Sequence, residues 1–208
     1  MSLDLAITRG VEILTLNVPP LNTLDLFTVL AIGDYFSSIS GQHPLIITGH
    51  GKAFSAGVDT NAYASYSTEQ RDKLFSGINR MVEACRSIST PVVAAINGHA
   101  IGGGFVLALC ADYRIVTTGR HKFGLTEARA GVPFPDGPLD VIKQEIPFPL
   151  LRRLALTSWL VSEDLLFENH ILDEIVDPHQ LMDSAIDRAL DLQQQKGFAE
   201  VKCQIMRK

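Results

Sequence analysis

The chain has 208 residues, of which 46% are hydrophobic and 20% are charged, a composition that indicates one folded globular domain and excludes an intrinsically disordered chain. Its 18 Lys and Arg residues against 23 Asp and Glu residues give a formal net charge of -5, so neither nucleic acid nor an anionic membrane is expected as a partner. No apolar run reaches membrane-spanning length and no signal-like segment is visible, which favours a cytoplasmic protein.

The first third of the chain alternates strand-like and helix-like segments. Residues 3–7 and 11–17 are rich in branched side chains and flank Arg9-Gly10, a pair typical of a hairpin turn. Apolar residues recur at helical spacing over residues 24–39, and residues 44–51 read as a buried strand that ends in glycines. The sequence therefore predicts a strand hairpin, an amphipathic helix and a further buried strand, in this order.

The middle third repeats the alternation. Ser67 and Gln70 have the spacing of a capping box at the start of a helix, and the apolar face of that helix is predicted to comprise Leu74, Ile78, Met81, Val82 and Cys85. Residues 90–98 read as the next strand, and the glycines at 102–104 precede a helix that runs through Ala111. Strand-like runs at 113–118 and 121–127 follow.

Helical patterns dominate the last third, at residues 150–158, 163–169 and 181–195. Strands and helices in alternation predict an α/β core over residues 1–150, and the remainder predicts a short C-terminal helical segment over residues 151–208. The three cysteines, Cys85, Cys110 and Cys203, are widely spaced and odd in number, so we expect reduced thiols and no metal site.

Two glycine-bearing turns, at residues 49–59 and 97–104, each follow an apolar strand and precede a helix. Main-chain N–H groups at helix starts attract oxygen atoms that carry negative charge. Two such turns that face each other would form an oxyanion hole. Alternatively, the glycines at 102–104 serve only close packing or a strained turn.

Three ordered blocks resemble the crotonase superfamily, the enoyl-CoA hydratase/isomerase family. They are KAFSAGVD at 52–59, INGHAIGGGFVLALCADYRI at 96–115 and FGLTEARAGVPFP at 123–135, with a weaker block at 162–178. The resemblance covers nearly the whole chain, which is shorter than is usual for the family. It implies a core of repeated ββα units, a homotrimer or dimer of trimers, and an acyl-CoA thioester as substrate, with no other cofactor. The C-terminal segment would then cover the acyl pocket and support oligomerisation.

The resemblance also implies roles for individual residues. The thioester oxygen would accept hydrogen bonds from the main-chain N–H groups of Val58 and Gly103. Ala56, Gly102 and Val106 would line the substrate site, and Asp59 would lie near the coenzyme A moiety while capping the helix that follows. Main-chain donors would polarise the carbonyl whatever side chains they carry.

One catalytic carboxylate is present where the family's hydratases have two. The first position is Val106 and the second is Glu127. Shifting a double bond from the 3,4 to the 2,3 position needs one base, whereas hydration divides its work between two carboxylates. The leading prediction is therefore an isomerase with Glu127 as acid and base. Apolar neighbours are expected to raise the pKa of its carboxyl, namely Phe123, Leu125, Ala128 and Val132.

Two other functions stay open. A hydratase or thioester hydrolase would need a substitute for the missing acid, and the candidates are Asp136, Asp140 and a bound water. The aspartates qualify if the loop expected there approaches the acyl chain; ordinary turn roles are their alternative. A catalytically weak acyl-CoA-binding protein would keep only the fold and the oxyanion hole. His50 and His99, beside the glycine turns, either contact coenzyme A or are loop histidines. Ser55 lacks a His and Asp partner at any motif spacing, which disfavours a serine hydrolase.

Overall fold

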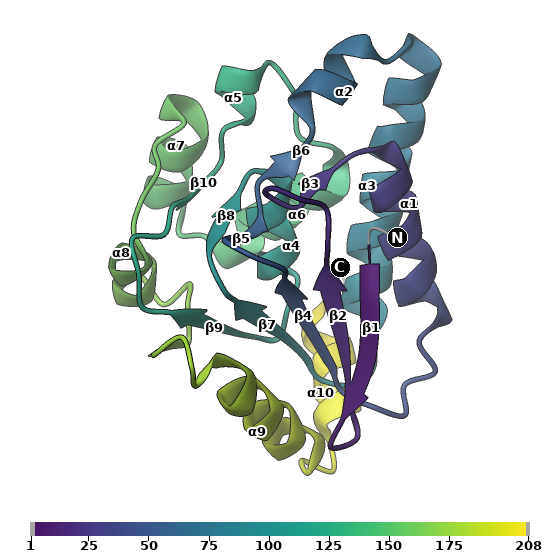
Figure 1. The fold of residues 1–208 in the computed structure, drawn as a ribbon, viewed down its shortest axis with the longest axis vertical. Coiled ribbons are helices and arrows are strands. Elements are labelled where there is room, and N and C mark those ends of the chain that lie inside the picture. The colour runs from purple at the N-terminus through teal and green to yellow at the C-terminus, as the bar shows by residue number, and fades with distance from the viewer. Residues whose placement is uncertain (1–2, 207–208) are drawn as a thin grey trace.

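A six-stranded sheet runs through the molecule, of which the computed structural model describes residues 3–206 (Figure 1). In spatial order, its strands are β1 (Leu3–Thr8), β2 (Val11–Leu16), β4 (Leu45–Gly49), β7 (Val92–Ile96), β9 (Tyr113–Thr117) and β11 (Glu174–Val176). Only the β1–β2 pair is antiparallel, and Arg9-Gly10 turns between them with positive φ at both residues. The predicted hairpin is confirmed.

Short strands form two smaller sheets beside the large one. One has the order β10 (Phe123–Gly124), β8 (His99–Ile101), β5 (Ala53–Ser55), and the other pairs β3 (Thr23–Leu24) with β6 (Gly57–Val58). A strand of the large sheet, a short strand and a helix therefore follow one another from β2, from β7 and from β9, and from β4 two short strands precede the helix. This confirms the expected ββα units and the α/β fold class.

The strand expected over residues 121–127 is largely wrong. Only Phe123 and Gly124 pair with β8, and the chain then leaves the extended conformation at Thr126, whose φ and ψ are -106° and 11°. Glu127 begins the short helix α5 (Glu127–Ala130). The apolar side chains of this run are buried around a turn, which sequence alternation alone does not distinguish from a strand.

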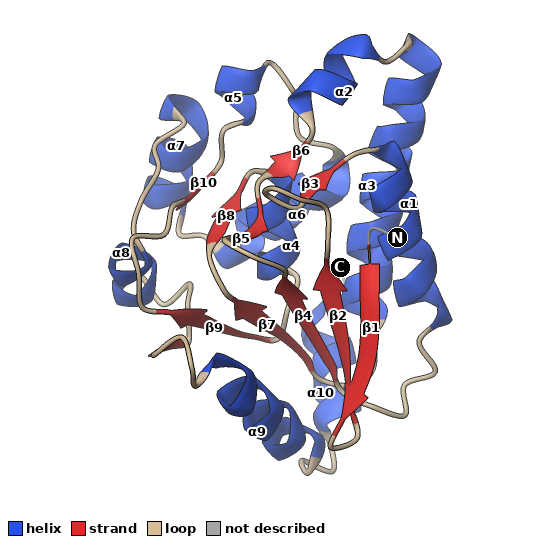
Figure 2. Ribbon diagram, viewed as in Figure 1, coloured by secondary structure: helices blue, strands red, loops and turns tan. Residues whose placement is uncertain are grey.

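Helices cover both faces of the large sheet (Figure 2). Besides α5, the helices of the described residues are α1 (Leu26–Ser38), α2 (Thr60–Ser65), α3 (Thr68–Ser87), α4 (Gly103–Leu109), α6 (Asp136–Glu145), α7 (Phe148–Thr157), α8 (Glu163–Glu168), α9 (Leu181–Gln193) and α10 (Phe198–Met206). The capping box of Ser67 and Gln70 is present at the start of α3, as predicted, and all five residues of the predicted apolar face of α3 are buried.

The core has two parts, one on each face of the large sheet. The larger part joins the sheet to α1, α3, α4, α6 and α7. In the smaller part, side chains of α9 pack on the other face, namely Leu181, Ala185, Ile186 and Ala189. Strands that are buried on both faces need continuous apolar runs, which explains the sequences of β4 and β7.

The C-terminal segment is mostly helical, as expected, but it also contributes β11, which extends the sheet beside β9. Lys202 anchors α10 through its Nζ, which lies 2.6 Å from Oδ2 of Asp112 and 3.2 Å from the carbonyl oxygen of Thr90. The pocket-covering and oligomerisation roles of residues 151–208 stay predictions. Among residues 3–206, no helix combines the length and the apolar composition needed to cross a membrane, and no cluster of potential ligands is suited to a metal ion.

Candidate active site

The first glycine turn presents the N–H group of Val58. Val58 lies opposite Leu24 in the β3–β6 pair, and the next N–H, of Asp59, donates to the carbonyl oxygen of Leu24 at 3.2 Å. Successive N–H groups of a strand point to opposite sides. The N–H of Val58 therefore points away from β3, toward the side on which α4 begins.

A buried asparagine and a buried serine hold this turn in place. The side-chain amide of Asn22 donates to the carbonyl oxygens of His50 at 3.0 Å and Ala53 at 2.8 Å. Ser55 Oγ donates to the carbonyl oxygen of Asn22 at 2.6 Å and accepts the N–H of Gly57 at 3.2 Å. Both hydrogen bonds give Ser55 a structural role, in keeping with the prediction against a serine hydrolase. No role for Asn22 is predicted from the sequence. The available signal is its place after two consecutive prolines and before a strand, since asparagine is common in turns.

The three consecutive glycines have three different surroundings. Gly102 has φ 54°, a conformation that glycine adopts without strain. A Cβ on Gly104 would lie 2.3 Å from the carbonyl oxygen of Ser55, so close packing requires glycine there. A Cβ on Gly103 would meet no atom nearer than 3.5 Å, and its φ is not positive. The packing and strained-turn explanations thus apply to Gly104 and Gly102, and neither of them explains Gly103.

The main chains of the two glycine turns meet at Gly57 and Gly103. A Cβ on Gly57 would lie 2.8 Å from the nitrogen of Gly103, and a Cβ on Gly103 would lie 3.8 Å from the nitrogen of Val58. Gly103 is the first residue of α4, so its N–H has no acceptor within the helix. The structure therefore brings the two predicted donors together.

Glu127 lies beside the second turn. A Cβ on Gly102 would lie 3.1 Å from Glu127 Oε1, and Oε2 is buried without a hydrogen-bond partner among the described residues. Burial raises the pKa of the Glu127 carboxyl to about 7, while the N–H groups of Glu127 and Thr126 act to lower it. The predicted rise is therefore found. Three of the four expected apolar neighbours are buried and Ala128 is exposed.

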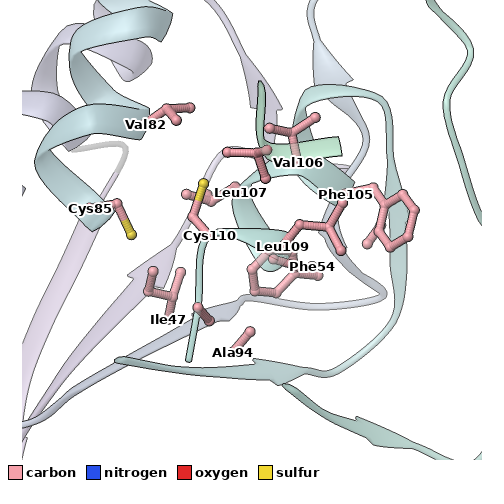
Figure 3. Close-up of a cluster of buried hydrophobic side chains, with 14 of the residues drawn as sticks. Ile47, Phe54, Val82, Cys85, Ala94, Phe105, Val106, Leu107, Leu109 and Cys110 are labelled. Carbon is pink, nitrogen blue, oxygen red and sulfur yellow. The ribbon is translucent and has the colours of Figure 1, made fainter. Parts of the chain in front are cut away.

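Val106 lies one turn into α4 and belongs to the hydrophobic core. Its N–H donates to the carbonyl oxygen of Gly102 at 3.0 Å, and its side chain is 2% exposed. Figure 3 draws it among buried apolar side chains that include Val82 and Leu107. This position supplies neither a charge nor a proton donor to the site.

The two predicted substrate-binding residues of the first block, Ala56 and Asp59, both make hydrogen bonds to main-chain groups of the protein. Asp59 caps α2, as expected, by accepting the N–H groups of Asn61 at 3.0 Å and Ala62 at 2.9 Å. The N–H of Ala56 donates to the carbonyl oxygen of Leu21 at 2.9 Å. The half-buried side chains of Ala56 and Asp59 flank the turn that carries Val58.

The aspartates and histidines that the sequence offered as further candidates lie on other elements than Val58, Gly103 and Glu127. Asp136 and Asp140 belong to α6, so the loop expected there is wrong: the chain enters a helix at Asp136. Both aspartates line a cavity of about 640 Å³ between α3, α6 and α10, whose lining does not include Val58, Gly103 or Glu127. Among the histidines, His99 accepts the N–H of Lys122 at its Nδ1, at 3.0 Å, while His50 has an exposed side chain.

Comparison with known proteins decides the family. The family described as enoyl-CoA hydratase/isomerase matches residues 6–208. This chain belongs to that family. A carnitinyl-CoA dehydratase of Salmonella arizonae is 34% identical to it over 208 residues, which cover 96% of this chain and 78% of the relative.

Solved structures of the family share the fold. The crystal structure of an enoyl-CoA hydratase from Bacillus anthracis superimposes with a TM-score of 0.89 at 27% identity, over 99% of this chain and 82% of that chain. An enoyl-CoA hydratase from Mycobacterium smegmatis gives a TM-score of 0.88 at 24% identity, over 100% of this chain and 85% of that chain. The resemblance found in the three sequence blocks is thereby confirmed.

Proposed function

We propose that this member of the enoyl-CoA hydratase/isomerase family shifts the double bond of a 3-enoyl-CoA to the 2-enoyl position. The observation that carries the proposal is one half-buried carboxyl, Glu127, beside two adjacent main-chain donors, with Val106 buried where a second carboxylate would be needed. The raised pKa of Glu127 suits a group that accepts and returns a proton near neutral pH.

The reaction needs one base and one anion site. The Glu127 carboxylate removes a proton from C2, and the electron pair of that C–H bond moves into the thioester carbonyl. The N–H groups of Val58 and Gly103 stabilise the enolate oxygen, and each such donor commonly contributes about 3 kcal/mol. The carboxylic acid then returns the proton to C4, the 3,4 double bond moves to the 2,3 position, and the carboxylate is restored. The mechanism requires neither a metal nor a cofactor.

A second candidate is addition or removal of water, which the name of the carnitinyl-CoA dehydratase relatives favours. Removal of water from a 3-hydroxyacyl-CoA needs a base at C2 and an acid at the departing hydroxyl. The aspartates considered as substitute acids line a cavity whose walls exclude Glu127. Glu127 would then have to serve both steps alone, which is why isomerisation is preferred.

A panel of thioesters tests the proposal. Purified protein is incubated with 3-enoyl-CoA, 2-enoyl-CoA or 3-hydroxyacyl-CoA of matched chain length. Three reactions are measured separately: double-bond migration, addition or removal of water at C3, and release of free coenzyme A. We expect migration to be the fastest reaction. Faster water addition or removal would replace isomerase by hydratase, and fast thiol release would indicate a hydrolase. Tight binding without turnover would indicate the acyl-CoA-binding function.

We further propose that the chain assembles as a homotrimer or a dimer of trimers. The support is the family's own assembly together with apolar side chains that this chain leaves exposed on α7, Phe148 at 72% and Leu156 at 73%. Exposed apolar side chains that form a contiguous patch mark interaction surfaces in many proteins. Sedimentation equilibrium measures the assembly directly, and a monomer at micromolar concentration would contradict the proposal.

A further inference from the structure

The helix that carries Glu127 is tied to the end of a different helix. The N–H of Arg129, on α5, donates to Ser158 Oγ at 3.2 Å, and the Arg129 guanidinium donates through Nη2 to the carbonyl oxygen of Ser158 at 3.0 Å. Ser158 follows the last residue of α7 and is 3% exposed. One buried residue therefore receives two hydrogen bonds from a helix of only four residues.

The first of these hydrogen bonds replaces a missing cap. The opening N–H groups of a helix have no acceptor within it, and the residue before the helix commonly accepts the N–H of the third helical residue. Thr126 holds that place in α5 but makes no side-chain capping bond. Arg129 is the third residue of α5, and Ser158 Oγ accepts its N–H instead.

The segment that begins at Ser158 also contacts β10, the strand before α5. Phe123 and Val161 exchange two main-chain hydrogen bonds, of 3.0 and 2.9 Å. A Cβ on Gly124 would lie 2.5 Å from the carbonyl oxygen of Trp159, so the two segments are in direct main-chain contact. Ser158 itself has φ 50°, in the left-handed region, which turns its hydroxyl toward α5. Residues 158–161 thus hold 123–129 at both ends.

We infer that Ser158 is a positioning residue for Glu127, holding α5 in place through Arg129 so that the Glu127 carboxyl stays beside Gly102. Glu127 is the first residue of α5, two residues before Arg129, and Oε1 lies 3.1 Å from where a Gly102 Cβ would be. Because α5 has only four residues and no side-chain cap at its N-terminus, the orientation of its first turn depends on contacts with neighbouring segments. The inference rests on the proposed role of Glu127 as the base.

The test variant is Ser158→Gly, which removes the hydroxyl and accepts a positive φ without strain. We expect kcat for double-bond migration to fall by about tenfold to a hundredfold, the scale of a misplaced catalytic group, while KM changes by less than about threefold. The midpoint of the pH profile of kcat/KM should also move to lower pH, because a loosened carboxyl gains water and its pKa returns toward the ordinary value. A purely structural role would lower the rate without moving that midpoint.

Thr157→Ala is the matched control. Thr157 is the neighbouring residue, it is exposed, and its hydroxyl donates to the carbonyl oxygen of Arg153 at 2.6 Å within α7. We expect wild-type kcat and midpoint for this variant. Arg129→Met removes the second hydrogen bond and keeps the first, and should shift the midpoint in the same direction by a smaller amount. Wild-type kcat and midpoint in both Ser158→Gly and Arg129→Met would overturn the inference.

A measurement without substrate separates this inference from the proposed function. The pKa of the Glu127 carboxyl is followed by ¹³C NMR in the free protein, for wild type and for the two variants. A lowered pKa in the variants supports the positioning role even if wild type fails to isomerise any thioester. If the wild type is active and the pKa of Glu127 is the same in both variants as in the wild type, the positioning role is contradicted and the proposed function is not.

Discussion

Val106 and Glu127 lie at the two positions that the sequence resemblance matches to the glutamates of the family's hydratases, and their surroundings are opposite in kind. Val106 is in the middle of α4, with its side chain 2% exposed among apolar neighbours. Glu127 begins the four-residue helix α5, beside the glycine turn from which α4 starts. Its side chain is half-buried, and one of its carboxyl oxygens has no hydrogen-bond partner among the described residues. A carboxylate in place of Val106 would be buried and would resist ionisation, whereas Glu127 keeps enough contact with solvent to ionise. The site therefore combines a buried, neutral side at Val106 with a single titratable side at Glu127.

The largest expected effect comes from removing the titratable side. Glu127→Gln keeps the shape of the side chain and loses its ability to carry a proton. General acid and base catalysis commonly contributes about 100-fold to 10,000-fold, so the rate of double-bond migration should fall on that scale while acyl-CoA affinity is retained. Rates on a 3-enoyl-CoA and binding by calorimetry check this. A variant that keeps more than about a tenth of the wild-type rate would exclude Glu127 as the sole base.

The next effect concerns the main-chain donors. Gly103→Ala has room for its Cβ, at least 3.5 Å from any atom, yet that methyl group would lie 3.8 Å from the nitrogen of Val58 and obstruct an oxygen bound there. We expect activity to fall about 100-fold or more, with thermal stability equal to wild type or higher, since alanine favours a helix.

Two variants serve as controls for the donors. Gly104→Ala should lower thermal stability, because its Cβ would lie 2.3 Å from the carbonyl oxygen of Ser55. Val58→Ala retains its N–H and should be mild. If Gly103→Ala retained wild-type activity, the oxyanion hole would not lie between these two turns.

A smaller effect is expected from placing a carboxylate on the neutral side. Val106→Glu buries an unpartnered carboxyl, which should lower the free energy of unfolding by about 3 kcal/mol. If the variant folds, it should add water to a 2-enoyl-CoA, whereas Val106→Gln should not. Denaturant unfolding and the hydration assay check the two parts. A folded Glu variant without water addition would show that Val106 is not the only difference from a hydratase.

The smallest effect is a change of stability with pH. The pKa of Glu127 is raised to about 7 in the folded protein. Its contribution to stability is therefore full below the ordinary carboxyl pKa of the unfolded chain and is lost as pH rises through the folded-state pKa of about 7. Glu127→Gln does not titrate and should therefore gain about 2 kcal/mol on wild type between pH 5 and pH 8, a figure reduced for partial solvent contact. Urea unfolding at both pH values measures it. An equal difference at the two pH values would contradict the raised pKa.

Much of this arrangement could be predicted from the sequence, because it depends on local patterns. Alternating apolar runs and the capping box at Ser67 gave the order of strands and helices, and the blocks around Val58, Gly103 and Glu127 gave the candidate site. The helical starts at Glu127 and Asp136 were missed, because a buried turn and a proline-rich segment have the same composition as a strand end and a loop.

Hydrogen bonds between segments that are far apart in the chain could not be predicted from the sequence. Arg129 and Ser158 are 29 residues apart, and no sequence pattern links one to the other. Asn22 likewise reaches across 31 residues to Ala53. Such side-chain hydrogen bonds to distant main-chain atoms follow from the folded arrangement and leave no periodic signal in the sequence.

The pH dependence of double-bond migration tests the single-base account most directly. The kcat/KM of the wild type is measured from pH 5 to pH 9 on a 3-enoyl thioester of pantetheine without phosphate, so that the substrate does not titrate. One carboxylate that works as base and then as acid predicts a single rising limb with a midpoint near the pKa of about 7 and a plateau above it. Glu127→Gln should lack that limb. A bell-shaped profile, with a second group that must stay protonated, would contradict the account.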